Sequence, residues 1–146
     1  MQKWGALLAL VGILLIPAIA NADDAATIDE IEAASDGLNQ AFQRQDEAYI
    51  KENTTDDHMA MFALWSGPKS IAENLELLGD LKMKQTILSG PDVMLLAPKV
   101  AMRTSTMKLE GEYQGKPLEE RVYKTQIMVK RNGKWLEKFY QSTILD

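Results

Sequence analysis

The second half of the chain contains three long strand-like runs, separated by two dipeptides that are typical of tight turns. The runs span 100–113, 119–130 and 134–144, and the dipeptides between them are Gln114–Gly115 and Asn132–Gly133. Asn-Gly favours a two-residue hairpin because both of its turn positions adopt positive φ. Consecutive hairpins of this kind predict an antiparallel meander, which is the strongest constraint that the sequence places on the fold.

Three amphipathic segments precede the meander. The first follows Thr27 and Glu30, which have the spacing of a capping box, the second is a short helix capped by Asp46, and the third covers about 71–78. A short strand, 58–64, is expected between the second and third helices. Helices followed by a meander predict the α+β class, with helices packed on one face of a curved antiparallel sheet. Such a sheet leaves a pocket at its open end.

The N-terminus has the parts of a secretory signal. Lys3 supplies a positive start, Ala6–Ile16 is an unbroken apolar stretch of 11 residues, and small residues precede a cleavage site expected after Ala22 or two residues earlier. The apolar stretch is shorter than the roughly 20 residues that span a bilayer. We therefore expect a signal peptide over 1–22 and a single domain over 23–146, exported to the periplasm or secreted. A retained N-terminal anchor is the alternative.

Charge and composition exclude several classes of function. Removing Lys3 with the signal leaves 15 Lys and Arg against 21 Asp and Glu, a net charge of −6. An acidic chain is a poor match for nucleic acid or an anionic membrane. The chain has no cysteine, which excludes disulfides, thiol catalysis and iron–sulfur chemistry. No phosphate loop or zinc signature occurs either, so we expect neither a cofactor nor a metal.

Two stretches resemble a known superfamily. The segment 43–62, QRQDEAYIKENTTDDHMAMF, is similar to the second helix and first strand of the nuclear transport factor two-like superfamily. The segment 129–144, VKRNGKWLEKFYQSTI, is similar to the last hairpin of its SnoaL-like branch of uncharacterised function (DUF4440-type). The resemblance covers nearly all of 27–144 and implies a cone-shaped α+β fold, also called cystatin-like, that often forms homodimers. Because this fold hosts enzymes, carriers and assembly modules, it does not fix the function.

Ketosteroid isomerase, one enzyme of this superfamily, gives a direct test. It uses a carboxylate base with a tyrosine and a protonated aspartic acid as oxyanion donors. The resemblance places these three positions on Phe62, Leu38 and Gln126, respectively. A phenylalanine cannot take a proton, so this chemistry is not available in that form, although Gln126 is able to donate a hydrogen bond.

The last hairpin predicts which side chains line the pocket. A two-residue turn at Asn132–Gly133 pairs Gln126 with Phe139, Lys124 with Gln141, and Met128 with Glu137. The resemblance places Gln126 on the concave side, so the predicted pocket face carries Lys124, Gln126, Met128, Trp135, Phe139, Gln141 and Thr143. The opposite face, predicted to form a homodimer, carries Tyr123, Thr125, Ile127, Val129, Leu136, Tyr140 and Ile144. A one-residue bulge would exchange part of this assignment.

Two cations are expected beside this wall. Across the Gln114–Gly115 turn, Arg103 lies beside Gln126 and Ser105 beside Lys124. Arg103 and Lys124 are then suited to receive an anionic or carbonyl-bearing ligand. The alternative is surface cations, or cations paired with Glu110, Glu120 or Glu137. The complete set of predicted ligand-binding residues is Tyr49, Trp65, Arg103, Lys124, Gln126 and Gln141.

His58 is the only histidine and the predicted catalytic candidate. It shares strand parity with Ala60 and Phe62, and the resemblance puts Phe62 at an inward position. His58 is therefore expected to point inward, where an imidazole moves protons near neutral pH. The alternative is an orienting residue whose ring is held by Asp56 or a backbone carbonyl. His58 with Asp56 and Asp57 lacks metal-ligand spacing, because adjacent residues on a strand point to opposite faces.

The sequence is compatible with three classes of function. An exported protein that binds a small apolar or anionic ligand without turnover ranks first, and a structural or partner-binding module ranks second. An enzyme of isomerase, lyase or hydrolase type, using His58 with Arg103 and Gln126, ranks third because a second acid–base group is not evident.

Overall fold

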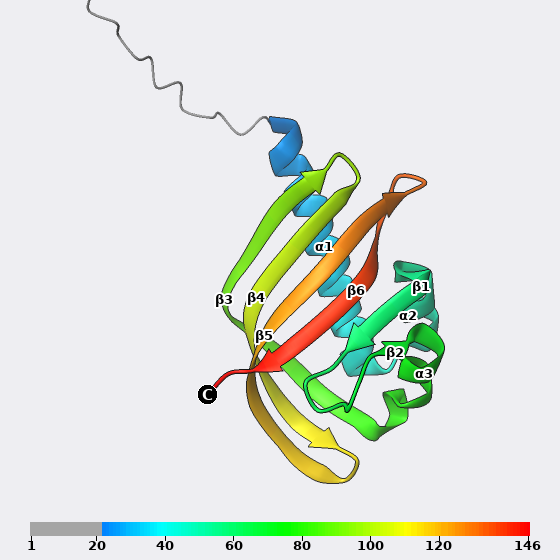
Figure 1. The fold of residues 1–146 in the computed structure, drawn as a ribbon, viewed down its shortest axis with the longest axis vertical. Coiled ribbons are helices and arrows are strands. Elements are labelled where there is room, and N and C mark those ends of the chain that lie inside the picture. The colour runs from blue at the N-terminus through cyan, green and yellow to red at the C-terminus, as the bar shows by residue number, and fades with distance from the viewer. Residues whose placement is uncertain (1–21) are drawn as a thin grey trace, which may run out of the picture.

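The computed structural model describes residues 22–146 as one α+β unit (Figure 1). The predicted signal peptide lies outside the described residues, except for Ala22, and its predicted cleavage stays an expectation. The helices are α1 (Ala22–Arg44), α2 (Glu47–Asn53), α3 (Ile71–Glu76) and the short 3-10 helix η1 (Leu78–Asp80). The strands are β1 (Thr54–Met61), β2 (Lys69–Ser70), β3 (Leu81–Ala97), β4 (Val100–Tyr113), β5 (Lys116–Arg131) and β6 (Lys134–Ile144).

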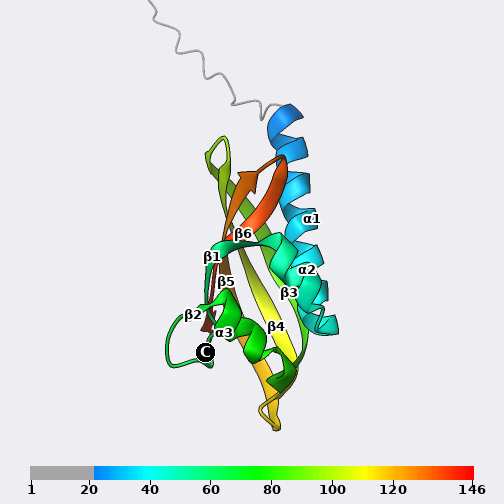
Figure 2. The same cartoon turned by 90° about the vertical axis from the view of Figure 1, so that its right-hand side faces the viewer.

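All six strands form one curved sheet in the order β2-β1-β6-β5-β4-β3. Neighbouring strands are antiparallel apart from β1 and β6, which run parallel. Helix α1 lies lengthwise along one face of the sheet, and none of the helices within residues 22–146 lies on the opposite face (Figure 2). The predicted class, a curved antiparallel sheet packed on three helices, is confirmed.

Local signals explain most helix boundaries. Asp46 caps α2 as predicted, because its side chain accepts a hydrogen bond from the Tyr49 backbone N–H. Ser70 and Glu73 form a reciprocal capping box at the start of α3. The predicted cap at Thr27 is wrong, since α1 is already helical there.

Strand boundaries differ from the prediction at β1 and β5. The bounds of β4 and β6 are those predicted, whereas β5 is longer and begins at Lys116. Strand β1 spans Thr54–Met61 instead of 58–64. The chain enters this strand directly after α2, because the parallel pairing of Thr54 with Glu137 on β6 extends β1 backward.

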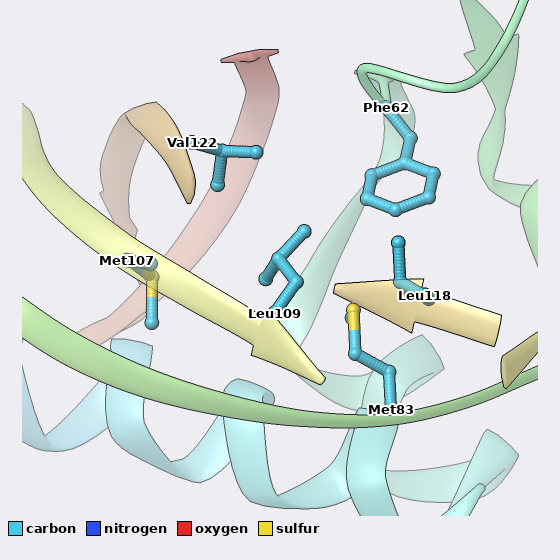
Figure 3. Packing of buried hydrophobic residues seen from close by; sticks show 6 residues of the cluster. All are labelled: Phe62, Met83, Met107, Leu109, Leu118 and Val122. Carbon is cyan, nitrogen blue, oxygen red and sulfur yellow. The ribbon is translucent and has the colours of Figure 1, made fainter. Parts of the chain in front are cut away.

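The interior beneath the helices contains three groups of packed apolar residues. The largest, here called the apolar cluster, occupies the sheet near the β4–β5 turn (Figure 3); it consists of Phe62, Met83, Met107, Leu109, Leu118 and Val122. A second group joins Ile31 of α1 to Trp135 of β6. A third group packs α1 against α2 and η1 and consists of Ala41, Ile50 and Leu78. The helices are thus held on a single face of the sheet by buried hydrocarbon.

The two hairpins differ in regularity. Strands β4 and β5 pair without interruption, and Arg103 lies opposite Gln126 as predicted. Between β5 and β6 the register shifts by one, because Met128 pairs with Glu137 but Ile127 pairs with Phe139. Lys138 is therefore an extra residue, which makes this a β-bulge.

The bulge corrects part of the predicted pocket wall. Beyond Lys138, Gln126 lies opposite Tyr140 and Lys124 lies opposite Ser142. Tyr140 therefore shares the inner face, contrary to the prediction. Gln141 lies opposite Thr125 and belongs to the outer face, so its predicted place beside Lys124 is wrong.

The outer face of the sheet remains partly apolar at its surface. Met59, Met94 and Tyr123 are 45%, 57% and 43% exposed, respectively. Within residues 22–146, none of the helices has the length and hydrophobicity that a membrane crossing requires.

Candidate functional site

A pocket opens between α1, the segment after β1 and the inner face of the sheet. Its volume is about 30 Å³, which accommodates about two water molecules. The lining residues from the helices and from the segment after β1 are Leu38, Asn39, Phe42, Phe62, Trp65 and Asn74. The remaining lining residues come from the sheet and are Leu81, Met83, Gln85, Lys124, Glu137 and Tyr140. The pocket thus has largely apolar walls and a small number of polar groups.

Lys124 is the main cation in this pocket. Its side chain comes from the middle of β5, and the residue is 5% exposed. The Nζ atom donates a hydrogen bond of 2.6 Å to Oδ1 of Asn39 and lies 5.1 Å from the centroid of the Tyr140 ring. An amide oxygen and an aromatic face replace water around the amine, but no carboxylate bonds to it directly.

The environment changes the ionisation of two pocket groups. Burial lowers the pKa of Lys124 to about 8, and the nearby charge of Arg103 acts in the same direction against the opposing charges of Glu137 and Asp36. Burial also raises the pKa of Tyr140, whose phenol is therefore neutral at physiological pH. The amine is consequently closer to losing its proton than an exposed lysine.

Glu137 supplies a buried carboxylate to the same pocket. His58 Nε2 lies 3.0 Å from its Oε1, and Gln126 Nε2 donates a hydrogen bond to its Oε2. Burial favours the neutral acid, but the bonds from His58 and Gln126 and the charge of Lys124 outweigh it, so the pKa lies below its ordinary value. The carboxylate is therefore ionised near neutral pH.

Gln126 connects this carboxylate to a second ion pair. Its Oε1 accepts hydrogen bonds from Ser35 Oγ at 2.9 Å and from Arg103 at 3.0 Å. The fully buried guanidinium of Arg103 also donates three hydrogen bonds of 2.8–3.1 Å to the carboxylate of Glu32. We call this set the polar network; it comprises Glu32, Ser35, His58, Arg103, Gln126 and Glu137.

The polar network limits what Arg103 and Gln126 can do for a ligand. Neither residue lines the pocket, and the strong donors and acceptors of both are directed to other side chains. The expected pairing of Arg103 with Gln126 is confirmed. Both residues lie outside the pocket lining, and Gln126 donates a hydrogen bond to Glu137, which does line the pocket.

His58 also lies behind the pocket. It points inward as its strand parity predicts and is 1% exposed, yet it is absent from the pocket lining. Its ring is held by Glu137, and the expected partner Asp56 is not the one observed. Asp57 points outward and pairs with Lys138 and Arg131. Within residues 22–146, Nδ1 of His58 has no hydrogen-bond partner.

Trp65, which is one of the predicted ligand-binding residues, lines the pocket, and Phe42 lines it as well. Tyr49 does not, because its hydroxyl packs against α1 at Gly37. A Cβ atom at Gly37 would lie 2.1 Å from Oη of Tyr49, so this close approach depends on the glycine. The predicted place of Tyr49 at the pocket is therefore wrong.

Three pocket residues, Glu137, Asn39 and Tyr140, were absent from the predicted site. A signal existed for Glu137, because pairing with Met128 puts a carboxylate on the inner face of β6. Asn39 lies on the buried side of α1, where a polar side chain needs a partner, and it bonds Lys124. Tyr140 turns inward only because of the bulge at Lys138.

The positions that correspond to ketosteroid isomerase carry no acid–base groups in the pocket. Leu38 and Phe62 line it as hydrocarbon. A carboxylate is nevertheless present, but it arrives from β6 as Glu137. In the part of the chain that the structure describes, no three His, Cys, Asp or Glu side chains gather as potential metal ligands.

Comparisons with known proteins support the fold. The sequence matches no protein-family model and no curated protein. An NTF2-like protein of unknown function in nutrient uptake from Rhodospirillum rubrum is 19% identical with a TM-score of 0.75, over 81% of this chain and 100% of that one. A protein with a cystatin-like fold from Caulobacter vibrioides is 16% identical with a TM-score of 0.70, over 82% and 89% of the two chains.

A third similar structure carries the name of an enzyme. The ketosteroid isomerase-like protein from Erwinia carotovora atroseptica is 19% identical with a TM-score of 0.65, over 81% of this chain and 95% of that one. At such identities the likeness concerns the arrangement of the backbone and not the activity. Together with the curved sheet and its three helices, it gives this chain the NTF2-like, α+β fold.

Proposed function

We propose that the chain binds a small organic molecule with an apolar body and an anionic or carbonyl head, with the head at Lys124. The observation that supports this proposal is a pocket with hydrocarbon walls that ends on a buried amine. Burying an ammonium without a carboxylate bonded directly to it is unfavourable, and a ligand acceptor would offset that cost. Trp65 and Phe42 at the half-buried rim are suited to hold the apolar body.

The small volume of the pocket restricts the ligand. A space of about 30 Å³ accepts a head of two or three heavy atoms, so the body has to lie between the rim side chains. Trp65 belongs to the segment between β1 and β2, which contains no helix or strand. Rotation of its side chain would widen the opening without disturbing the sheet.

Benzoate is a suitable first probe, because it joins a carboxylate to one aromatic ring. Binding is followed by tryptophan fluorescence, since Trp65 lines the pocket. Lys124→Met should weaken binding at least about tenfold, the effect of losing one charge-assisted hydrogen bond. Lys116→Met is the matched control, because Lys116 is exposed at the β4–β5 turn.

Equal affinity in wild type and Lys124→Met would contradict the assignment of the head group to Lys124. Absence of binding for benzoate, phenylacetate and short alkanoates alike would contradict the anionic class of ligand. A melting curve for each variant separates loss of binding from loss of the fold.

A second candidate function is proton transfer, in which Glu137 acts as the base. It rests on the buried carboxylate that His58 and Gln126 orient beside the pocket. In this hypothesis His58 is a positioning residue for Glu137, and Arg103 orients Glu137 indirectly, through its hydrogen bond to Gln126. Deuterium exchange at the α-carbon of a bound ketone tests it: Glu137→Gln should abolish the exchange, whereas His58→Gln should reduce it. No exchange with the wild-type protein would reject this function.

We further propose a homodimer formed through the outer face of the sheet, in a protein exported after cleavage of its signal. With the register corrected, this face includes Ile127, Phe139, Met59 and Tyr123. Ile127→Asp should convert a dimer to a monomer in light scattering. A monomeric wild-type protein at tens of micromolar would reject the dimer. The residues of the last hairpin also favour the SnoaL-like, DUF4440-type branch.

A further inference from the structure

We propose that Lys124 is a nucleophilic amine that captures the carbonyl group of a small aldehyde or ketone as an imine. This inference rests on the proposed function, since the carbonyl compound has to enter the same pocket. It goes further by assigning a covalent step to one atom, the Nζ of Lys124.

The surroundings of Lys124 suit a nucleophile better than a structural cation. A structural lysine is normally held by a carboxylate, as Lys108 is by Glu110 at 2.8 Å and Glu119 at 3.1 Å. Lys124 instead donates its single strong hydrogen bond to the neutral amide of Asn39. The amide fixes the direction of the amine without strengthening its hold on the proton as a direct ion pair would.

Burial supports the same reading. Lys124 has its pKa lowered to about 8, mainly by desolvation, whereas Lys108 has its pKa raised by its two carboxylate partners. At neutral pH a measurable fraction of Lys124, on the order of a tenth, therefore carries a free lone pair. The ring of Tyr140 at 5.1 Å still favours the ammonium, so the amine retains both forms.

The pocket contains groups that can move the required protons. The Nζ lone pair attacks the carbonyl carbon, a C–N bond forms, and the carbonyl electron pair moves to oxygen, which takes up a proton. Glu137, ionised and lining the same pocket, is placed to accept the proton that nitrogen loses. The resulting carbinolamine expels its hydroxyl as water, and the C=N bond forms. One amine and one carbonyl thus give one imine and one water, without an oxidant or reductant.

Benzaldehyde is a probe matched to benzoate, since both carry the same ring and differ in the reactive head. The full-length protein is incubated with benzaldehyde and sodium cyanoborohydride at about pH 7, and the labelled site is found by peptide mapping. Lys124 should be labelled at least about tenfold faster than any other lysine, because exposed lysines are almost fully protonated there. The α-amino group, with an ordinary pKa near 8, is the internal competitor that mapping separates.

Further measurements sharpen the result. Benzoate should protect Lys124 from labelling but leave Lys116 and the α-amino group unaffected. Glu137→Gln should slow labelling of Lys124 several-fold if the carboxylate accepts the proton. Lys124→Arg keeps a cation but has no primary amine, so it should lose the label at this position.

The failures of the two proposals are distinguishable. Benzoate binding without preferential labelling of Lys124 would overturn the imine and leave the proposed function standing. Preferential labelling that benzoate does not block would overturn the shared pocket, because the reactive amine would then not lie where the acid binds. Neither binding nor labelling would reject both proposals. The wild-type mapping decides the imine even if a variant fails to fold.

Discussion

The apolar cluster and the polar network both lie at the inner face of the sheet, and apart from Glu32 the side chains of both are buried. Every member of the apolar cluster contacts its neighbours through hydrocarbon, which has no directional requirement (Figure 3). In the polar network, each strong donor or acceptor of Gln126 and Arg103 is matched by a named partner. The apolar cluster is stabilised by the apolar surface area that it buries, and the polar network is stabilised by the geometry of its hydrogen bonds.

The pocket lies where these two regions meet. Phe62 and Met83 of the apolar cluster form part of its wall, and Glu137 of the polar network forms part of its floor. The apolar cluster can therefore adapt to the body of a ligand, whereas the polar network fixes the carboxylate beside its head. Substitutions in the two regions should consequently differ in size and in how they are rescued.

The largest effect is expected for Arg103→Met in the polar network. Removing the guanidinium leaves Glu32 without its partner and the Gln126 carbonyl with Ser35 alone, so the free energy of unfolding should fall by about 4 kcal/mol. Urea denaturation measures the loss. Adding Glu32→Met should recover a substantial part of it, because an apolar pair replaces the broken ion pair. A double variant with a lower free energy of unfolding than Arg103→Met would contradict this explanation.

A comparable but smaller loss is expected for Leu109→Ala in the apolar cluster. The residue is 1% exposed, and a buried Leu→Ala change should lower the free energy of unfolding by about 3 kcal/mol. Leu109→Met is the matched control and should change it by less than about 1.5 kcal/mol. If the Met variant were as unstable as the Ala variant, shape rather than hydrocarbon area would dominate this region.

The third prediction concerns pH and Lys124. Its folded pKa of about 8 lies below the ordinary value of 10.5, so between these values the unfolded chain binds more protons. The free energy of unfolding should therefore increase with pH in this window, by about 2 kcal/mol between pH 8 and 10. The Lys124→Met variant should lack this increase. A parallel pH dependence in the two proteins would assign the titration to other groups.

The smallest effect is expected for His58→Gln. Glutamine retains a donor for the carboxylate of Glu137, so the free energy of unfolding should fall by about 1 kcal/mol. His58→Leu is the informative companion, since it removes the donor and should cost about 3 kcal/mol by leaving Glu137 with one hydrogen bond fewer. Equal losses for Gln and Leu would show that packing, and not the hydrogen bond, matters at this position.

Local signals in the sequence were enough for much of the fold. The turns at 114–115 and 132–133 fixed β4 and β6, and the Asp46 cap placed α2. Strand parity with Phe62, which the family resemblance places inward, correctly predicted the inward direction of His58. Each of these depends on residues close together in the chain, which is why a pattern reveals them.

The polar network was less accessible to prediction. Arg103 meets Glu32 across 71 residues and His58 meets Glu137 across 79, and no spacing rule joins such distant groups. The β5–β6 bulge shifted Tyr140 and Gln141 to faces opposite those expected, because alternation counts residues and a bulge adds one. The site was therefore predicted in part: Lys124 and Trp65 line the pocket, whereas Tyr49 and Gln141 do not.

The bulge at Lys138 has a consequence for insertions and deletions in the gene. Strand β6 holds one residue more than the pairing with β5 uses, and that residue sits between Glu137 and Phe139. Loss of the codon for Lys138 would restore simple alternation and keep Tyr140 and Ser142 on the inner face. A codon inserted in β5 opposite the bulge would have a different outcome: Lys138 would gain a partner, and regular alternation would point Glu137 and Tyr140 to opposite faces. At this point of the hairpin the pocket side chains of β6 therefore tolerate the loss of one residue, but not the gain of one residue in the partner strand.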